Sequence, residues 1–151
     1  MKLSGTYWLK APKEMVWPAL NNIEILGQSI PGCKEIKPVD AGENSSYEIT
    51  MIAGIGSVKG TYKGTIKISD TIPGSQRKLS LNASGNNGFV RAEGLVRIEE
   101  AEGETVIDYS GEAQIGGSIA GVGQRMIDGA AKLLLSQFFR SFEAAVKNSD
   151  K

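Results

Sequence analysis

The 151-residue sequence contains no histidine, and this absence removes several kinds of catalytic site. Histidine is the side chain best suited to general acid–base catalysis near neutral pH, and it is the commonest metal ligand. Ser-His-Asp and Cys-His sites are therefore excluded within this chain. A zinc site would need carboxylates or several cysteines, and Cys33 is the single cysteine. We expect no metal, no cofactor and no enzymatic activity.

The sequence also lacks an excess of charge and a long apolar run. Lys+Arg and Asp+Glu are each 17, so the net charge is zero and does not favour nucleic acid as a partner. No apolar run approaches the roughly 18 residues that span a bilayer. The N-terminal MKLSGTYWLK has no signal-peptide core, and one cysteine provides no disulfide. We expect a cytoplasmic protein.

The hydrophobic pattern changes twice along the chain. A strand over Leu3–Lys10 precedes a short helix that Ala11–Glu14 opens and Pro18 interrupts, then a second short helix over Asn22–Ser29. A long helix over 118–147 ends the chain. Between them, period-two segments joined by turns such as Ala41–Ser45 predict strands near 33–39, 46–53, 58–70, 76–85, 88–100 and 104–115. We therefore predict one α+β domain, 1–151, with a curved antiparallel sheet of about seven strands around the long helix.

The face of each strand that should point inward carries small residues among larger apolar ones. Gly60, Gly64, Gly85, Gly94 and Gly111 all share that face. One interpretation is that these glycines let the sheet bend, and another is that they leave a space for an apolar ligand. The residues predicted to line such a cavity are Tyr47, Ile49, Met51, Tyr62, Leu81, Ala83, Val90, Ala92, Gly94, Tyr109, Met126, Ala130, Leu133, Leu134, Gln137, Phe138 and Ser141.

The C-terminal helix is amphipathic, with a polar stripe that includes Asp128, Lys132 and Arg140. Gln137 and Ser141 fall within its apolar arc. Because buried polar groups need partners, these two side chains bond either to protein or water, or to a polar group of a bound molecule. The sequence leaves both interpretations open.

The stretch GGSIAGVG before this helix resembles a phosphate-binding loop, but it lacks the Lys-Ser or Lys-Thr that such a loop requires. No strand follows the helix, so a dinucleotide-binding unit is also excluded. We interpret Gly116, Gly117, Gly121 and Gly123 as a gate or hinge near the mouth of the cavity. A row formed by Lys59, Lys63 and Lys67 is a solvated face or a contact for anionic lipid or an acidic protein.

Several segments resemble the CoxG family of carbon monoxide dehydrogenase proteins, within the START/Bet v1-like superfamily. They are MKLSGTYWLKAPKEMVWPALNN, IPGC at Ile30–Cys33, GSVKGTYKGTIKISD at Gly56–Asp70, GFVRAEG, and QIGGSIAGVGQRMIDGAAKLLLSQFF at Gln114–Phe139. The resemblance implies a helix-grip fold around an apolar cavity.

The resemblance also implies a non-catalytic accessory protein. Its expected partners are an apolar small molecule, namely a lipid or a quinone, and the subunits of a CO-dehydrogenase-type molybdenum hydroxylase that it links to the cytoplasmic membrane. Some members carry a C-terminal extension that reaches the membrane, whereas this sequence stops at Lys151. We therefore expect peripheral membrane contact at most.

Two alternatives remain open at this point. One is a docking or assembly module whose interior is filled by side chains, which a continuous internal pocket would argue against. The other is an enzyme similar to helix-grip cyclases or hydrolases, in which Tyr62 or Tyr109 would act beside a buried carboxylate.

Overall fold

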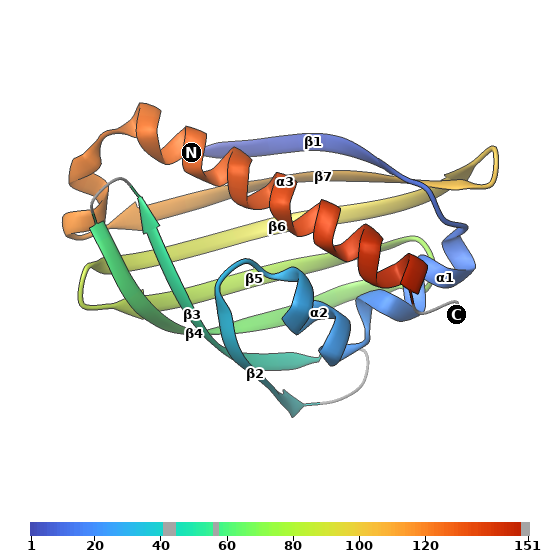
Figure 1. Ribbon diagram of the computed structural model, residues 1–151, viewed down its shortest axis with the longest axis horizontal. Coiled ribbons are helices and arrows are strands. Elements are labelled where there is room, and N and C mark those ends of the chain that lie inside the picture. Colours follow the sequence, from blue (N-terminus) through green and yellow to red (C-terminus); the bar gives the residue numbers. More distant parts are fainter. Residues whose placement is uncertain (41–44, 56–57, 149–151) are drawn as a thin grey trace.

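A computed structural model describes residues 1–40, 45–55 and 58–148, and in this part of the chain seven strands form one antiparallel sheet (Figure 1). The spatial order is β1-β7-β6-β5-β4-β3-β2, so every strand except β1 lies beside its neighbour in sequence. The bounds are β1 (Lys2–Leu9), β2 (Cys33–Asp40), β3 (Ser46–Ile55), β4 (Val58–Ile72), β5 (Gln76–Gly85), β6 (Gly88–Ala101) and β7 (Glu104–Gly116). The predicted strands are confirmed, while the turn predicted at Ala41–Ser45 falls on residues 41–44, outside the described residues.

Two short helices connect β1 to β2. They are α1 (Lys13–Leu20) and α2 (Ile23–Ser29). Helix α1 contains Pro18, which has no backbone N–H to donate, and the helix ends two residues later. The Asn22 side chain accepts hydrogen bonds from the backbone N–H groups of Glu24 (3.0 Å) and Ile25 (3.2 Å), and so caps α2.

The predicted single helix over 118–147 is two elements, and this part of the prediction is wrong. A 3₁₀ helix, η1 (Ser118–Val122), is followed by α3 (Gln124–Asn148). Gly123 separates them with φ 101° and ψ 150°, a conformation that only glycine adopts readily and that no helix can contain.

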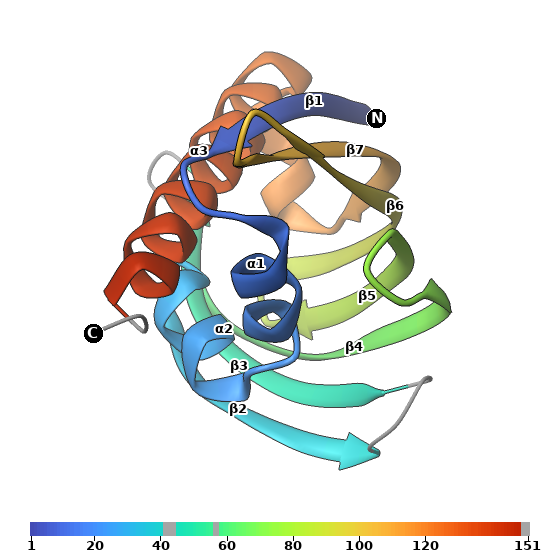
Figure 2. The ribbon, with the colours of Figure 1, turned by 90° about the vertical axis from the view of Figure 1, so that its right-hand side faces the viewer.

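The sheet curves around α3, which lies across its concave face, and α1 occupies the opening at one end of the sheet (Figure 2). Side chains alternate between the two faces, as β1 illustrates with exposed residues at even positions and less exposed ones at odd positions. This arrangement of a curved antiparallel sheet gripping a long C-terminal helix is the helix-grip fold that the sequence predicts.

Three glycines of the sheet are covered by an aromatic ring from a neighbouring strand. A Cβ atom on Gly5 would meet the Tyr109 ring, one on Gly85 would meet the Tyr62 ring, and one on Gly116 would meet the Phe89 ring. In all three pairs the two residues lie directly opposite each other in register. At these positions the missing side chain is replaced by a neighbour's ring, so these glycines leave no empty space.

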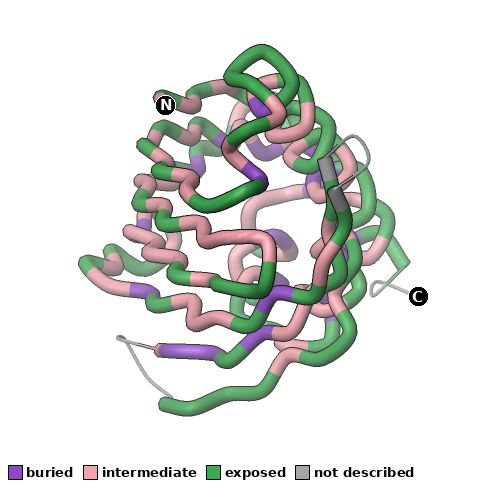
Figure 3. Tube along the Cα trace, turned by 90° about the vertical axis from the view of Figure 1, so that its left-hand side faces the viewer, coloured by how far each residue is buried: buried purple, intermediate pink, exposed green. Residues whose placement is uncertain are grey.

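The core is concentrated where α1 and the C-terminal half of α3 meet the sheet. Leu9, Val16, Phe142 and Val146 are all fully buried there. Thr105 is also fully buried, and its hydroxyl donates a 2.7 Å hydrogen bond to the Ala11 carbonyl oxygen. At the opposite end of the sheet, few loop residues are buried, and most are exposed or half-buried (Figure 3).

Candidate functional site

An apolar cavity of about 370 Å³ lies between the concave face of the sheet and α3. All seven strands and all three α-helices of the described chain contribute to its lining. The volume lies within the range of small-molecule sites, and such sites are typically apolar with few polar groups. The structure therefore contains an apolar space beside the small residues of the sheet, which is one of the two interpretations that the sequence allowed.

Six of the residues predicted to line a cavity do border this one. They come from β3, β5, β6, β7 and α3, and are Tyr47, Leu81, Ala92, Gly94, Tyr109 and Phe138. Gly94 lies directly opposite Gly111 of β7, which also borders the cavity. Neither glycine adds a side chain to the lining, so the cavity reaches the backbone of both strands at this position.

A second group of predicted residues is buried or half-buried but does not border the cavity. Ile49 and Tyr62 are buried, and the others are half-buried: Met51, Ala83, Val90, Ala130 and Gln137. Most of the strand residues in this group lie toward the β5–β6 turn. The buried Tyr62 ring occupies that end, and the cavity lies closer to α1 and α2 than predicted, since Leu20, Leu26 and Ile30 border it.

Four residues predicted on α3 are exposed, and their placement in the cavity lining is wrong. Met126 is 49% exposed, Leu133 54% and Leu134 37%. Ser141 is also exposed. The three consecutive leucines of this helix point in directions about 100° apart, and of these Leu135 borders the cavity. The apolar arc of the helix is wider than the part that faces the sheet, and the sequence pattern did not distinguish the two.

The short helices contribute lining residues that the sequence reasoning missed. Leu20 of α1, Leu26 of α2 and Ile30 border the cavity. The sequence analysis derived its strand lining from the alternation of side chains, and alternation identifies residues that share a face only within a strand. No pattern within α1 or α2 indicates that they close the open end.

Arg77 of β5 is the most informative residue that the sequence analysis missed. It is 4% exposed and borders the apolar cavity. A signal was present, because Arg77 falls on the same alternating phase as Leu79 and Leu81, which the pattern assigns to the inward face. A charged residue in that phase predicts a buried cation.

The Arg77 guanidinium is held by neutral groups of α1 and its C-terminal end. Nη2 donates to Asn21 Oδ1 at 2.7 Å, Nη1 donates to the Leu20 carbonyl oxygen at 3.4 Å, and the Trp17 ring centroid lies 4.5 Å from Cζ. Burial lowers the pKa of Arg77, and the nearby Tyr47 opposes that shift to a smaller extent. Nε is buried without a hydrogen-bond partner in the described structure.

The four glycines predicted as a gate have different surroundings. Gly116 faces the Phe89 ring, and Gly117 has φ 88° with Gly88 Cα in the way of any Cβ. Gly123 needs glycine for its backbone conformation, whereas Gly121 has neither a positive φ nor a neighbour within 4 Å of a Cβ. The junction is also tied down, since Ser118 Oγ and Ile119 N both donate to the Asn87 carbonyl oxygen. A structural requirement therefore exists at three of these positions, and a gating role remains a prediction.

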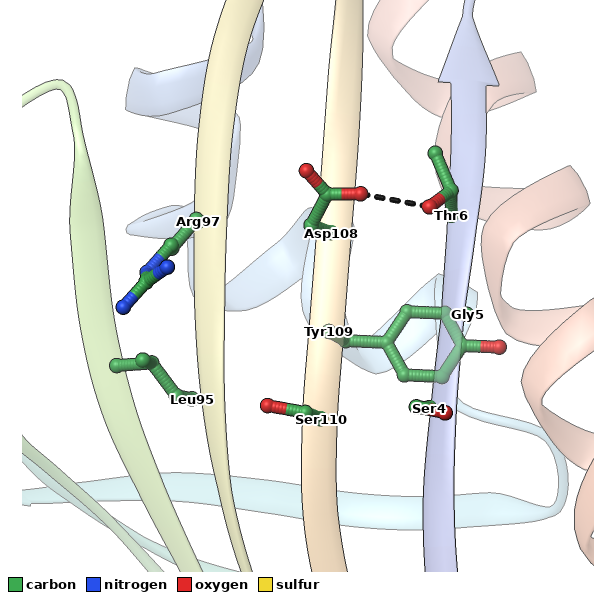
Figure 4. Close-up of a pocket in the computed structure, with 8 residues that line it drawn as sticks. All are labelled: Ser4, Gly5, Thr6, Leu95, Arg97, Asp108, Tyr109 and Ser110. Carbon is green, nitrogen blue, oxygen red and sulfur yellow. Dashed lines mark hydrogen bonds between the residues drawn. The ribbon is translucent and has the colours of Figure 1, made fainter.

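A second hollow, of about 350 Å³, lies on the outside of the sheet (Figure 4). Thr6 Oγ1 donates a 2.6 Å hydrogen bond to Asp108 Oδ1, with Arg97 on the adjacent strand. These polar side chains are exposed, so water competes with each of their interactions. The apolar cavity is therefore the stronger candidate site.

The described residues do not form a metal site, a membrane-spanning helix or a buried acid beside a tyrosine. Within them, no group of three or more Cys, Asp or Glu side chains is placed to hold a metal ion. No helix among those described is long and apolar enough to cross a membrane. The buried polar or charged residues in this part of the chain are Ser29, Ser46, Arg77 and Thr105, so no described carboxylate is buried beside Tyr62 or Tyr109.

Comparison with solved structures supports the helix-grip fold. A conserved protein from Geobacillus kaustophilus is 36% identical, with a TM-score of 0.91, over 99% of this chain and 97% of that one. A START superfamily protein from Mycobacterium smegmatis has a TM-score of 0.71 at 14% identity, covering 97% of both chains. The ZhuI aromatase/cyclase from Streptomyces sp. R1128 has a TM-score of 0.72 at 10% identity, over 100% of this chain and 96% of that one.

Comparison with curated proteins gave no significant match. The family profile that describes CoxG, a subunit of carbon monoxide dehydrogenase, matches residues 5–147, from β1 to the last turn of α3. With the fold, the cavity and this nearly complete match together, the chain belongs to the carbon monoxide dehydrogenase CoxG family.

Proposed function

We propose that this protein is a non-catalytic accessory protein that binds an apolar small molecule, a lipid or a quinone, in its internal cavity. The observation that carries the proposal is the continuous apolar space of about 370 Å³ between the sheet and α3. A module used only for docking would have no need of such a space, since native interiors are otherwise closely packed. Membership of the CoxG family and the START-like fold support the same conclusion.

We further propose that the protein links a CO-dehydrogenase-type molybdenum hydroxylase to the membrane. The family's description supports the association with carbon monoxide dehydrogenase. Peripheral membrane contact is supported by the exposed face of α3, where Met126, Leu133 and Leu134 lie among the exposed cations Arg125 and Lys132. Apolar residues flanked by cations are typical of helices that lie on anionic membranes.

An enzymatic function is the alternative that the fold itself raises, because the ZhuI aromatase/cyclase shares this architecture. At 10% identity that likeness concerns the fold alone. A cyclase would need acid or base groups directed into the cavity. The titratable groups bordering this cavity are Arg77, two tyrosines, and two glutamates that are exposed, which supports binding over catalysis.

Filling the cavity tests the proposal directly. Ala92→Leu adds three carbon atoms to a residue that borders the cavity. The matched control is Ala144→Leu, since Ala144 is exposed on α3 and does not border the cavity. With the neutral fluorophore N-phenyl-1-naphthylamine as probe and decylubiquinone as competitor, we expect Ala92→Leu to weaken binding by about tenfold and Ala144→Leu to leave it within twofold. Equal binding by all three proteins would contradict the proposed site.

A further inference from the structure

Arg77 is a buried cation whose protein partners leave it incompletely satisfied. It is the charged residue among the four buried polar residues in the described part of the chain. Its two Nη atoms donate to the Leu20 carbonyl and the Asn21 amide oxygen, and its flat face lies near Trp17. Each of these partners is neutral, and Nε is buried with no partner in the described structure.

The acidic side chains near Arg77 do not supply a counter-charge. Glu93 and Glu112 border the same cavity but are exposed. Asp40 lines a neighbouring recess that also includes Arg77, and it too is exposed and accepts a 3.4 Å hydrogen bond from Ser46 Oγ. The end of α1 at Leu20 contributes partial negative charge through its carbonyl groups, which is weaker than a carboxylate.

A buried charge without a charged partner is costly, and a buried N–H without an acceptor adds to that cost. A guanidinium presents its N–H groups in a planar fork that fits a carboxylate in a bidentate or single charge-assisted bond. Nε is the unused part of that fork. A carboxylate there would supply both the missing acceptor and the missing charge.

We propose that the occupant of the cavity is an amphipathic monocarboxylic acid, whose carboxylate accepts a hydrogen bond from Arg77 Nε–H while its apolar chain lies along the sheet. This inference rests on the proposed function and narrows the lipid it names to a fatty-acid-like molecule. The apolar chain would contact residues such as Leu79, Leu81 and Phe139, which border the cavity beyond Arg77. The site then has the usual composition of an apolar pocket with one polar group that fixes orientation.

The test compares dodecanoate, dodecanol and decylubiquinone as competitors of N-phenyl-1-naphthylamine at pH 8. The wild-type protein is expected to bind dodecanoate at least tenfold more tightly than dodecanol. Arg77→Met is expected to lose this preference while its affinity for dodecanol stays within twofold. The bonding partners of Arg77 are neutral, so Arg77→Met leaves no buried charge unpaired, and the variant should remain native.

Two further variants separate the Nε contact from general effects of charge. Arg97→Met removes a cation from the outer face of β6, one residue from Val96, which pairs with Arg77, and should behave as wild type. Arg77→Lys keeps a charge without the planar fork and should show a smaller preference than wild type. Circular dichroism on all variants verifies the fold.

The outcomes distinguish the inference from the function on which it rests. If the wild type binds dodecanol and dodecanoate equally, or if Arg77→Met weakens decylubiquinone but leaves dodecanoate unchanged, the carboxylate proposal is overturned and the cavity proposal stands. If the wild type binds none of the probes, the proposed function fails, and this inference fails with it.

Discussion

The two halves of α3 are made of similar residues but meet the sheet differently. From Phe139 to Val146, three side chains are buried, and the Phe139 ring stacks on both Tyr7 (5.0 Å between centroids) and Tyr109 (5.4 Å). From Met126 to Leu134, Ile127 alone is buried and three large apolar side chains are exposed. One half anchors the helix to the sheet, and the other leaves an apolar surface in contact with solvent.

This difference teaches that an apolar helix face need not be a packed one. The anchored half adjoins α1 and the main core, where the Glu143 carboxylate also accepts hydrogen bonds from Tyr7 Oη of β1 and from the N–H of Lys10, which directly follows β1. The opposite end is held through η1, which bonds to the β5–β6 turn at Asn87. The α3 residues that border the cavity, Leu135, Phe138, Phe139 and Phe142, belong to the anchored half or adjoin it, so the exposed half can be substituted without changing the cavity lining.

The largest effect should come from truncating the anchored half. Phe142 has no exposed surface, and Phe142→Ala is expected to reduce the free energy of unfolding by about 3–5 kcal/mol. Leu133→Ala, on the exposed half, is expected to change it by no more than about 0.5 kcal/mol. Urea titration followed by circular dichroism measures both. Similar losses in the two variants would remove the distinction between the halves.

The junction before α3 should show the next largest effect. Gly117 has φ 88° and ψ −165°, which is essentially restricted to glycine, and a Cβ there would meet Gly88 Cα. Gly117→Ala is therefore expected to destabilise the protein by about 1–3 kcal/mol. A bulky residue at Gly117 would therefore disturb folding as well as any gate, so this position cannot test the predicted gate.

Gly121 still permits a test of the gate, because nothing lies within 4 Å of a Cβ at this position. Gly121→Val should leave the unfolding free energy nearly unchanged. If this segment gates the cavity, stopped-flow association of N-phenyl-1-naphthylamine should be slower in Gly121→Val than in wild type. Unchanged rates, together with unchanged stability, would indicate that Gly121 is needed neither for folding nor for ligand entry.

The next prediction tests whether the exposed half of α3 contacts a membrane. The double substitution Leu133→Ser with Leu134→Ser removes two of the three large apolar side chains exposed on this half without touching the core. Because burying a leucine side chain at an interface contributes on the order of 1 kcal/mol, we expect flotation with phosphatidylglycerol vesicles to fall by about tenfold. Ser136→Ala on the same helix serves as the control, and undiminished flotation of the double variant would contradict the contact.

Much of the fold could be predicted because it depends on local patterns. Period-two alternation and turn residues located the strands, and Pro18 and Asn22 marked the limits of the short helices. The cavity was predicted less well, since its position depends on which glycines a neighbouring ring covers. Gly85 and Gly94 look alike in sequence, and the residue opposite each one determines whether a ring or a second glycine lies beside it.

The smallest expected effect concerns the link between the anchored half and β1. Burial raises the pKa of Tyr7 above its ordinary value of 10.0, and the charge and hydrogen bond of Glu143 raise it further. The protonated phenol is favoured in the folded state, so its contribution is complete below about pH 10 and declines as the pH rises toward the folded pKa. Tyr7→Phe should therefore have a shallower fall in stability above pH 10 than wild type, as urea midpoints measured between pH 8 and 11 would reveal. Parallel curves would mean that this hydrogen bond does not contribute to anchoring α3, and that the stacking on Phe139 suffices.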